Sequence, residues 1–117
     1  MAFNYAQMQR TAASLITNFG GRGVLRRAGL KDRPIQCVVI DYKPEEQGLV
    51  NTGARRCLVS RIDPVTRAPM KIPPDHLLDK VVFAGEVLRI VKPDTGPRPN
   101  GTIVYHDLEV LYDSRAV

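Results

Sequence analysis

Apolar positions near the start of the chain recur at helical spacing. Between residues 4 and 19 they are separated by one, three or four positions, which draws one stripe along a helix: Tyr5, Met8, Ala12, Leu15, Ile16 and Phe19. The pattern predicts a helix over Asn4–Asn18. Asn4 can cap its start, with Gln7 three residues later as in a capping box. Gly20-Gly21 is expected to end it, because glycine tolerates the left-handed conformation that follows many helices.

From Arg22 the apolar period changes to two, which is typical of strands. The segment "RGVLRR" predicts a short strand, "GLKD" a turn, and "PIQCVVIDYK" a longer strand. Both faces of this longer strand are apolar, which indicates a central position in a sheet. Its two faces carry Ile35, Cys37 and Val39 on one side and Val38, Ile40 and Tyr42 on the other.

The rest of the chain continues this strand-and-turn pattern. "LVNTGARRCLVS" predicts two short strands around Asn51–Gly53, the second being Arg55–Ser60, and "KVVFAGEVLRIVK" predicts a hairpin that turns near Gly85. Asn100-Gly101 is expected to form a turn before the last strand, "TIVYHDLEVLY". That strand alternates apolar residues on one face, with a histidine among them: Val104, His106, Leu108, Val110 and Tyr112.

One helix followed by about six or seven short strands, with no helices between them, predicts a mainly β fold. We expect a small antiparallel barrel or sandwich with one N-terminal helix and long Pro-rich loops. A length of 117 residues fits a single domain. Its expected parts are the helix (4–18), the barrel (22–112) and a short tail (113–117).

The net charge of +5 is concentrated in the first third of the chain. Residues 1–34 contain six basic side chains and one acidic one, whereas the remainder is balanced. Contact with nucleic acid is one interpretation, since Arg and Lys neutralise phosphates. A solvated basic surface is the other, because no aromatic residues are interleaved with the charges.

Two cysteines are too few for a disulfide scaffold. Cys37 and Cys57 both lie among apolar residues, so buried free thiols are favoured over a bridge. No apolar run approaches the roughly 20 residues of a membrane span, and the start of the chain lacks the pattern of a signal peptide. We therefore expect a cytoplasmic origin and no membrane partner.

The sequence offers little catalytic chemistry. His76 and His106 occur in unrelated contexts, and no Cys-x-x-Cys or His-x-x-x-His spacing suggests a metal site. "GGRG" follows a helix and lacks the Lys of a phosphate loop. Asp107 and Glu109 are most simply the charges of an edge strand, which prevent wrong pairing. We expect no catalytic residue, no cofactor and no enzyme.

Two Pro-rich loops are the most distinctive features that remain. Proline narrows the unfolded ensemble, so such loops lose less entropy when they are ordered against a partner. The loops 61–80 and Asp94–Gly101 are therefore candidate docking elements. Their proposed contact residues are Pro69, Pro73, Pro74, Asp94, Pro97, Arg98 and Pro99.

The order of these features resembles a family, the small head–tail connector proteins of the head-closure or neck type in tailed bacteriophages. The helix "FNYAQMQRTAASLITNFG" precedes the basic "GRGVLRR", and "CVVIDYK" precedes "GLVNTGARRCLVS". The ending "VVFAGEVLRIVKPDTGPRPNGTIVYHDLEV" completes a resemblance that covers nearly the whole chain. Its most similar stretches are Gly53–Arg56, Gly85–Pro93 and Pro99–Tyr105. The chain departs from the family at Leu88, where an aromatic is common, and in its longer Pro-rich segment 61–80.

The resemblance implies a ring-forming virion protein of the phage neck, assembled in the bacterial host cytoplasm. Such rings are hexameric or dodecameric and surround a channel through which genomic DNA passes without sequence-specific contacts. A portal or adaptor protein would lie above the ring, and a tail-completion or tail-tube protein below it. The ring would help to retain the genome and provide the surface on which the tail docks.

Within this interpretation, the basic residues of the first third would face DNA or the acidic rim of a neighbouring ring. The hypothesis names Arg22, Arg26, Arg27 and Arg33. It expects that changing Arg26 and Arg27 to Glu weakens ring stacking or DNA retention without unfolding the chain. The alternatives are a small β-barrel that binds nucleic acid, and a small enzyme or ligand-binding barrel for which the sequence contains no catalytic constellation.

Overall fold

The computed structural model describes residues 4–41 and 54–112 and shows a mainly β fold, as the sequence predicts. The helix is α1 (Tyr5–Phe19), and a short 3-10 turn, η2, spans Pro99–Gly101. The strands are β1 (Gly21–Arg27), β2 (Arg33–Asp41), β3 (Arg55–Ser60), β4 (Asp79–Phe83), β5 (Glu86–Ile90) and β6 (Tyr105–Tyr112). The strand expected just before Asn51 and the tail 113–117 lie outside the described residues.

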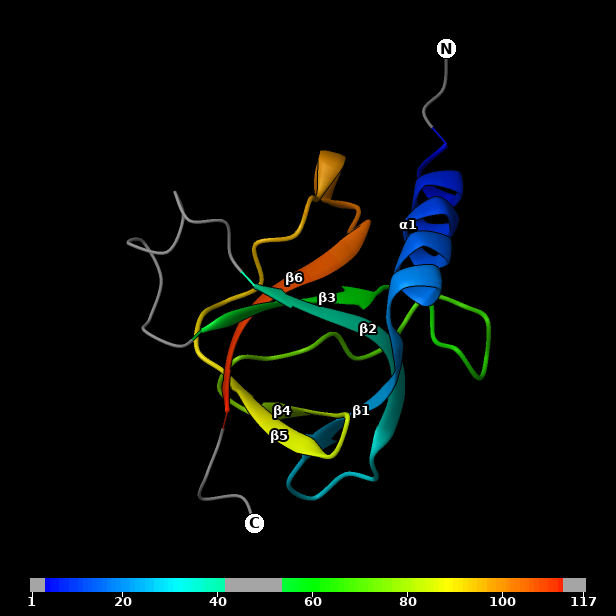
Figure 1. Ribbon diagram of the computed structural model, residues 1–117. Helices are drawn as coiled ribbons and strands as arrows, with labels where there is room; N and C mark the ends of the chain where they lie inside the picture. Colours follow the sequence, from blue (N-terminus) through cyan, green and yellow to red (C-terminus); the bar gives the residue numbers. More distant parts are fainter. Residues whose placement is uncertain (1–3, 42–53, 113–117) are drawn as a thin grey trace.

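The six strands close into a barrel in the order β1-β2-β3-β6-β5-β4, and every neighbouring pair is antiparallel (Figure 1). Closure comes from β1, which pairs with β2 along one side and with β4 along the other. The alternative of a sandwich is thereby excluded. Closure leaves no described strand with a free edge.

The core fills the barrel interior with one side chain from every second strand position. Met70, from the loop before β4, covers part of it. Cys37 and Cys57 are buried and free, which confirms the prediction of two unbridged thiols. The core cluster consists of Leu25, Ile35, Cys37, Cys57, Val59, Met70, Val81, Leu88, Ile90, Leu108 and Val110.

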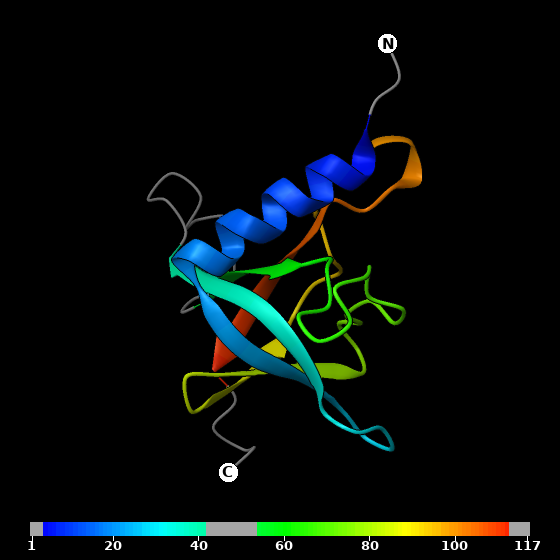
Figure 2. The same ribbon diagram turned by 90° about the vertical axis from the view of Figure 1, so that its right-hand side faces the viewer.

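Helix α1 lies obliquely across one end of the barrel and packs mainly on β2 and β3 (Figure 2). The Asn4 side chain accepts a hydrogen bond from the Gln7 N–H at 3.0 Å, which confirms the predicted cap. The buried face differs from the predicted stripe. Ile16 is buried, but Leu15 and Phe19 are 54% and 76% exposed. Gln9 takes their place, because its amide donates to the Ile103 carbonyl at 2.7 Å and thereby turns this polar position inward.

The turn from α1 into β1 requires glycine for a reason other than the predicted one. Gly20 has φ −125° and ψ −146°, which is extended backbone and not the left-handed conformation. A Cβ at Gly20 would collide with the backbone carbonyl of Cys37 and crowd that of Ile16. The residue therefore lets the helix approach β2 closely.

Replacing Gly20 by alanine is expected to lower the free energy of unfolding by about 2 kcal/mol, because the added methyl must push two backbones apart. The matched control is Gly29→Ala. Gly29 has φ +84° with nothing within 4 Å of a built Cβ, so only the left-handed backbone is strained there. That control should cost about 1 kcal/mol, which is the strain of the left-handed backbone alone. Urea denaturation measures both, and a smaller loss at Gly20 than at Gly29 would contradict the close-approach explanation.

Strand β6 is not the charged edge strand that the sequence suggested. It lies between β3 and β5, and its charged side chains are paired within the chain. The Asp107 carboxylate accepts from the Arg56 guanidinium at 2.6 Å, and Glu109 lies 3.3 Å from the Lys92 ammonium. These carboxylates hold neighbouring segments in place and do not prevent aggregation at an edge.

Candidate functional site

Two of the four arginines singled out from the sequence form a clamp around one buried carboxylate. The Asp79 side chain is fully buried and accepts both hydrogen bonds of the Arg27 fork at 2.8 Å and one from Arg33 at 2.6 Å. The backbone N–H of Asp75 donates a further bond at 2.8 Å. Burial raises the pKa of Asp79, but these hydrogen bonds more than offset it and hold that pKa below its ordinary value.

The clamp changes how the predicted contact residues are understood. The side chains of Arg27 and Arg33 are only 18% and 19% exposed, and both guanidinium groups are engaged inside the chain. Arg27→Glu would place a second carboxylate against Asp79. We therefore expect Arg27→Glu to destabilise the fold, so the prediction that surface contact can be tested without unfolding the chain is restricted to Arg26→Glu.

Arg26 and Arg22 point to different parts of the surface. Arg26 forms a two-bond ion pair with Asp32 across the β1–β2 hairpin, at 3.1 and 3.2 Å, with both side chains about half exposed. Such an exposed pair contributes little to stability. Arg22, at the other end of β1, lines a groove and has no ion pair with any carboxylate in the described part of the chain.

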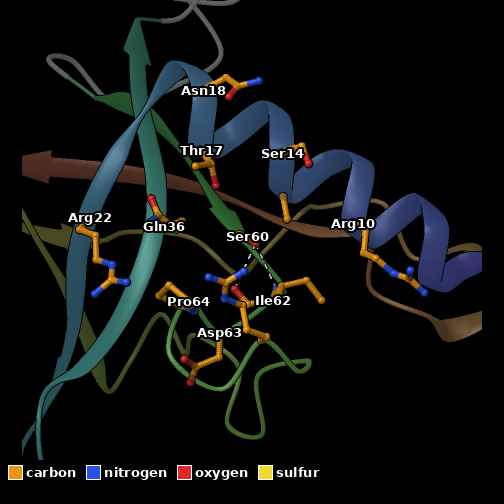
Figure 3. Close-up of a pocket in the computed structure, with 12 residues that line it drawn as sticks. Arg10, Ser14, Thr17, Asn18, Arg22, Gln36, Ser60, Ile62, Asp63 and Pro64 are labelled. Atoms are coloured by element: carbon orange, nitrogen blue, oxygen red, sulfur yellow. Dashed lines mark hydrogen bonds between the residues drawn. The ribbon is translucent and has the colours of Figure 1, made fainter.

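The groove lies between α1, strands β1 to β3 and the loop that follows β3 (Figure 3). Its volume is about 650 Å³. Figure 3 shows Arg10, Ser14 and Thr17 on the helix side and Arg22 with Gln36 on the strand side. Among the described residues, its lining consists of Arg10, Ala13, Ser14, Thr17, Asn18, Arg22, Gln36, Ser60, Ile62, Asp63, Pro64 and Arg67.

The charge of the groove is positive, with three arginines against one carboxylate. Arg10, Arg22 and Arg67 come from three different elements, and none forms an ion pair within residues 4–41 and 54–112. The Asp63 carboxylate accepts from the backbone N–H groups of Val65 and Thr66 at 2.8 and 3.3 Å, so it caps its own turn. The groove can therefore attract anions.

The loop wall of the groove is held by short-range contacts. The Ser60 hydroxyl bonds both the N–H and the carbonyl of Ile62, and Ile62 forms a bridge with Pro69. Arg67 has φ +63°, an uncommon conformation for a residue with a Cβ. The contacts around the loop hold Arg67 in that backbone conformation beside the groove.

The second Pro-rich loop, Asp94–Gly101, is anchored at both ends by its own chain. The Asp94 carboxylate accepts from the His106 ring Nδ1 at 2.6 Å and from the N–H groups of Gly96 and Asp107 at 2.8 Å each. Near the tip, the Asn100 amide donates to the Tyr5 hydroxyl at 2.6 Å. The predicted Asn100-Gly101 turn is confirmed, since both residues have positive φ.

These contacts divide the proposed docking residues into two groups. Asp94 is 8% exposed and fully engaged, so it positions the loop and offers no surface to a partner. Pro97 and Arg98 are exposed, as are Pro69 and Pro73, whereas Pro74 and Pro99 are half-buried. The most exposed apolar side chain near Pro74 is Leu77, at 80%, which the sequence reasoning did not single out.

Sequence reasoning also missed two of the three groove arginines. Arg10 stands on the polar side of a predicted helix, and Arg67 lies in a loop without periodicity. Neither position carries a local motif. The only available signal was their positive charge, which many solvated arginines share.

The structure also bears on the residues considered for catalysis. His106 is buried and bonds Asp94, twelve positions earlier, and not the adjacent Asp107. Within residues 4–41 and 54–112, no three His, Cys, Asp or Glu side chains gather in a way that could hold a metal ion. In the same segments, no helix has the length and apolar content needed to cross a membrane. Comparison of the chain with family models, curated proteins and solved structures finds no match.

Proposed function

We propose that this chain is a structural protein of the neck of tailed bacteriophage particles. It would form a hexameric or dodecameric ring between the portal side of the head and the tail, and it would help to retain the genome. The observation that carries the proposal is a closed barrel whose loops are anchored by buried carboxylates while their tips stay exposed. Anchored, protruding loops on an edge-free barrel suit a subunit that functions through contacts with its neighbours.

Within such a subunit, one group of residues would hold the loops in place and another would contact the neighbouring proteins. Asp79 and Asp94 fix the two loop bases, and Leu77, Pro97 and Arg98 remain exposed for contacts. The basic groove beside α1 provides an additional surface for an anionic partner. A portal or adaptor protein on one side and a tail-completion or tail-tube protein on the other are the proposed neighbours, with DNA passing through the channel.

One observation favours a second function, that of a small barrel which binds nucleic acid. Three arginines without acidic partners line one groove, as a phosphate site would require. None of the described residues that line the groove is aromatic, however, and single-stranded nucleic acid is generally held by stacking its bases on aromatic rings. The connector proposal is therefore preferred.

The test combines assembly state with nucleic-acid binding. We expect native mass spectrometry and negative-stain microscopy of the purified chain, alone or mixed with portal-bearing heads, to show rings. We also expect genes for portal, capsid and tail proteins beside its coding sequence. A chain that stays monomeric with heads present and binds single-stranded DNA at about 200 mM salt would support the nucleic-acid alternative.

A further inference from the structure

We propose that the groove formed by α1, β1–β2 and the loop 61–70 binds an extended acidic segment of a neighbouring protein. The carboxylates of that segment would be gripped by Arg10, Arg22 and Arg67. The inference rests on the proposed function only in taking the neighbour to be another protein of the same assembly. The ligand chemistry follows from the groove itself.

The three groove arginines have no ion-pair partner among the described residues. Several other arginines in the described residues pair with carboxylates, as with Arg26 and Asp32, Arg27 and Asp79, and Arg56 and Asp107. The three groove arginines share a single carboxylate nearby, and that carboxylate, Asp63, is occupied by backbone N–H groups. An anion from outside would supply the counter-charge that these three arginines lack within the described residues.

The groove is concave. The arginines come from a helix, a strand and a loop that line one recess of about 650 Å³, with Arg10 and Arg22 at opposite ends of it (Figure 3). A narrow chain that enters such a groove can meet all three walls. A DNA duplex presents its phosphates on a convex surface, which suits a flat or ridged array of cations better than a recess. The shape therefore favours a polypeptide over a duplex.

The rest of the groove lining is a mixture of polar and apolar side chains. Hydroxyl and amide side chains stand between the arginines, and Ala13, Ile62 and Pro64 supply apolar contacts. This mixture suits a peptide, whose backbone needs hydrogen-bond partners and whose side chains need apolar contact. The arginine fork matches a carboxylate in two-bond geometry, which gives orientation as well as charge attraction.

Both walls of the groove are held in place by contacts within the chain. Gly20 lets α1 lie close against β2, and the Ser60–Ile62 and Ile62–Pro69 contacts hold the opposite wall. The groove is thus formed before a ligand arrives, so binding spends little free energy on ordering the protein.

The experiment measures binding of fluorescein-labelled octaglutamate to the full chain by fluorescence anisotropy. Octaglutamine and a short DNA duplex are the comparison ligands. We expect octaglutamate to bind at least about tenfold more tightly than either, because each charged hydrogen-bonded contact adds appreciable affinity. Raising salt from about 50 to about 200 mM should weaken binding without abolishing it.

Charge-reversal variants locate the site. Arg22→Glu and Arg67→Glu should each weaken octaglutamate binding by about tenfold or more. Arg89→Glu is the matched control, since Arg89 is exposed on β5, across the barrel, and the variant has the same net charge. It should change the affinity by about twofold or less, as expected for distant screened charges. Circular dichroism and thermal unfolding establish that each variant is folded. Where a glutamate variant does not fold, the alanine substitution at the same position replaces it.

Three outcomes would overturn the proposal. Octaglutamate could fail to bind, Arg22→Glu and Arg89→Glu could weaken binding equally, or the duplex could bind more tightly and lose affinity in the same groove variants. The third outcome would make the groove a phosphate site. None of these measurements depends on ring formation, so failure of the peptide site and failure of the connector proposal are distinguishable.

Discussion

Replacing Asp79 by alanine is expected to lower the free energy of unfolding by about 3–5 kcal/mol. The carboxylate is fully buried and is shared by Arg27, Arg33 and the backbone N–H of Asp75. Its removal takes the contacting carboxylate away from two arginines that are each less than 20% exposed. Breaking one side of a buried ion pair is costly because the remaining charges have lost their contact with water.

Urea denaturation followed by circular dichroism measures this loss, and Asp32→Ala is the matched control. Asp32 also pairs with an arginine through two hydrogen bonds, but on the exposed β1–β2 hairpin. Its removal should cost about 0–1 kcal/mol. Similar losses at Asp79 and Asp32 would show that burial of the clamp does not decide its contribution. If Asp79→Ala does not fold at all, Asp79→Asn provides the measurable variant.

The clamp also determines the position of the long loop 61–80. Arg33 donates to the Ile72 carbonyl at 2.9 Å as well as to Asp79, and the Asp75 N–H bonds the same carboxylate. One buried acid therefore ties β1, β2, β4 and the end of the loop together. Loss of Asp79 should release the loop end that presents Leu77 and lower the stability of the barrel.

Local sequence patterns were sufficient for most of the fold. The apolar alternation of Arg55–Ser60 predicted β3 with its observed bounds, and Asn4 predicted the helix cap. The hairpin expected near Gly85 turns at Ala84-Gly85, where both residues have positive φ, as a tight two-residue hairpin requires. These features depend on neighbouring residues only, which is why single-sequence reasoning could find them.

The failures have a common physical cause, which is contact between residues far apart in the chain. Leu15 and Phe19 fit a helical stripe, but the carbonyl of Ile103 draws Gln9 inward in their place. Arg27 belongs to a basic run in the sequence, and its partner Asp79 stands 52 positions later. Periodicity carries no information on such pairs, so exposed and buried arginines could not be distinguished.

The groove likewise depends on residues that are far apart in the chain. Arg10, Arg22 and Arg67 come together because β1 joins the barrel beside α1 and the loop after β3 returns along the same side. Of these, only Arg22 was named from the sequence, and it was named for its charge. A site made from three elements becomes visible only when the closure of the barrel is known.

Replacing Asp94 by asparagine is expected to lower the free energy of unfolding by about 3 kcal/mol at neutral pH. The carboxylate is 8% exposed and serves the buried His106 ring and the N–H groups of Gly96 and Asp107. An amide offers one carbonyl oxygen where the carboxylate offers two acceptors. The variant therefore leaves at least one buried donor without a partner, and each such donor costs about 1–3 kcal/mol.

The pH dependence of this loss tests its electrostatic origin. Burial raises the pKa of Asp94, but the bonds from His106, Asp107 and Gly96 lower it by more, so the native pKa lies below the ordinary value. Because the folded state then holds its proton less tightly than the unfolded chain, the contribution of Asp94 is complete above the unfolded pKa of about 3.9. It is lost as the pH falls through the lower native pKa.

Asp79 also has a lowered pKa, and its protonation destabilises wild type and Asp94→Asn equally. The quantity to follow is therefore the gap between the free energies of unfolding of these two proteins. Urea denaturation from about pH 5 down to about pH 3 should show this gap narrowing below roughly pH 4. A gap that stays constant throughout would mean that the carboxylate acts through its shape and not through its charge.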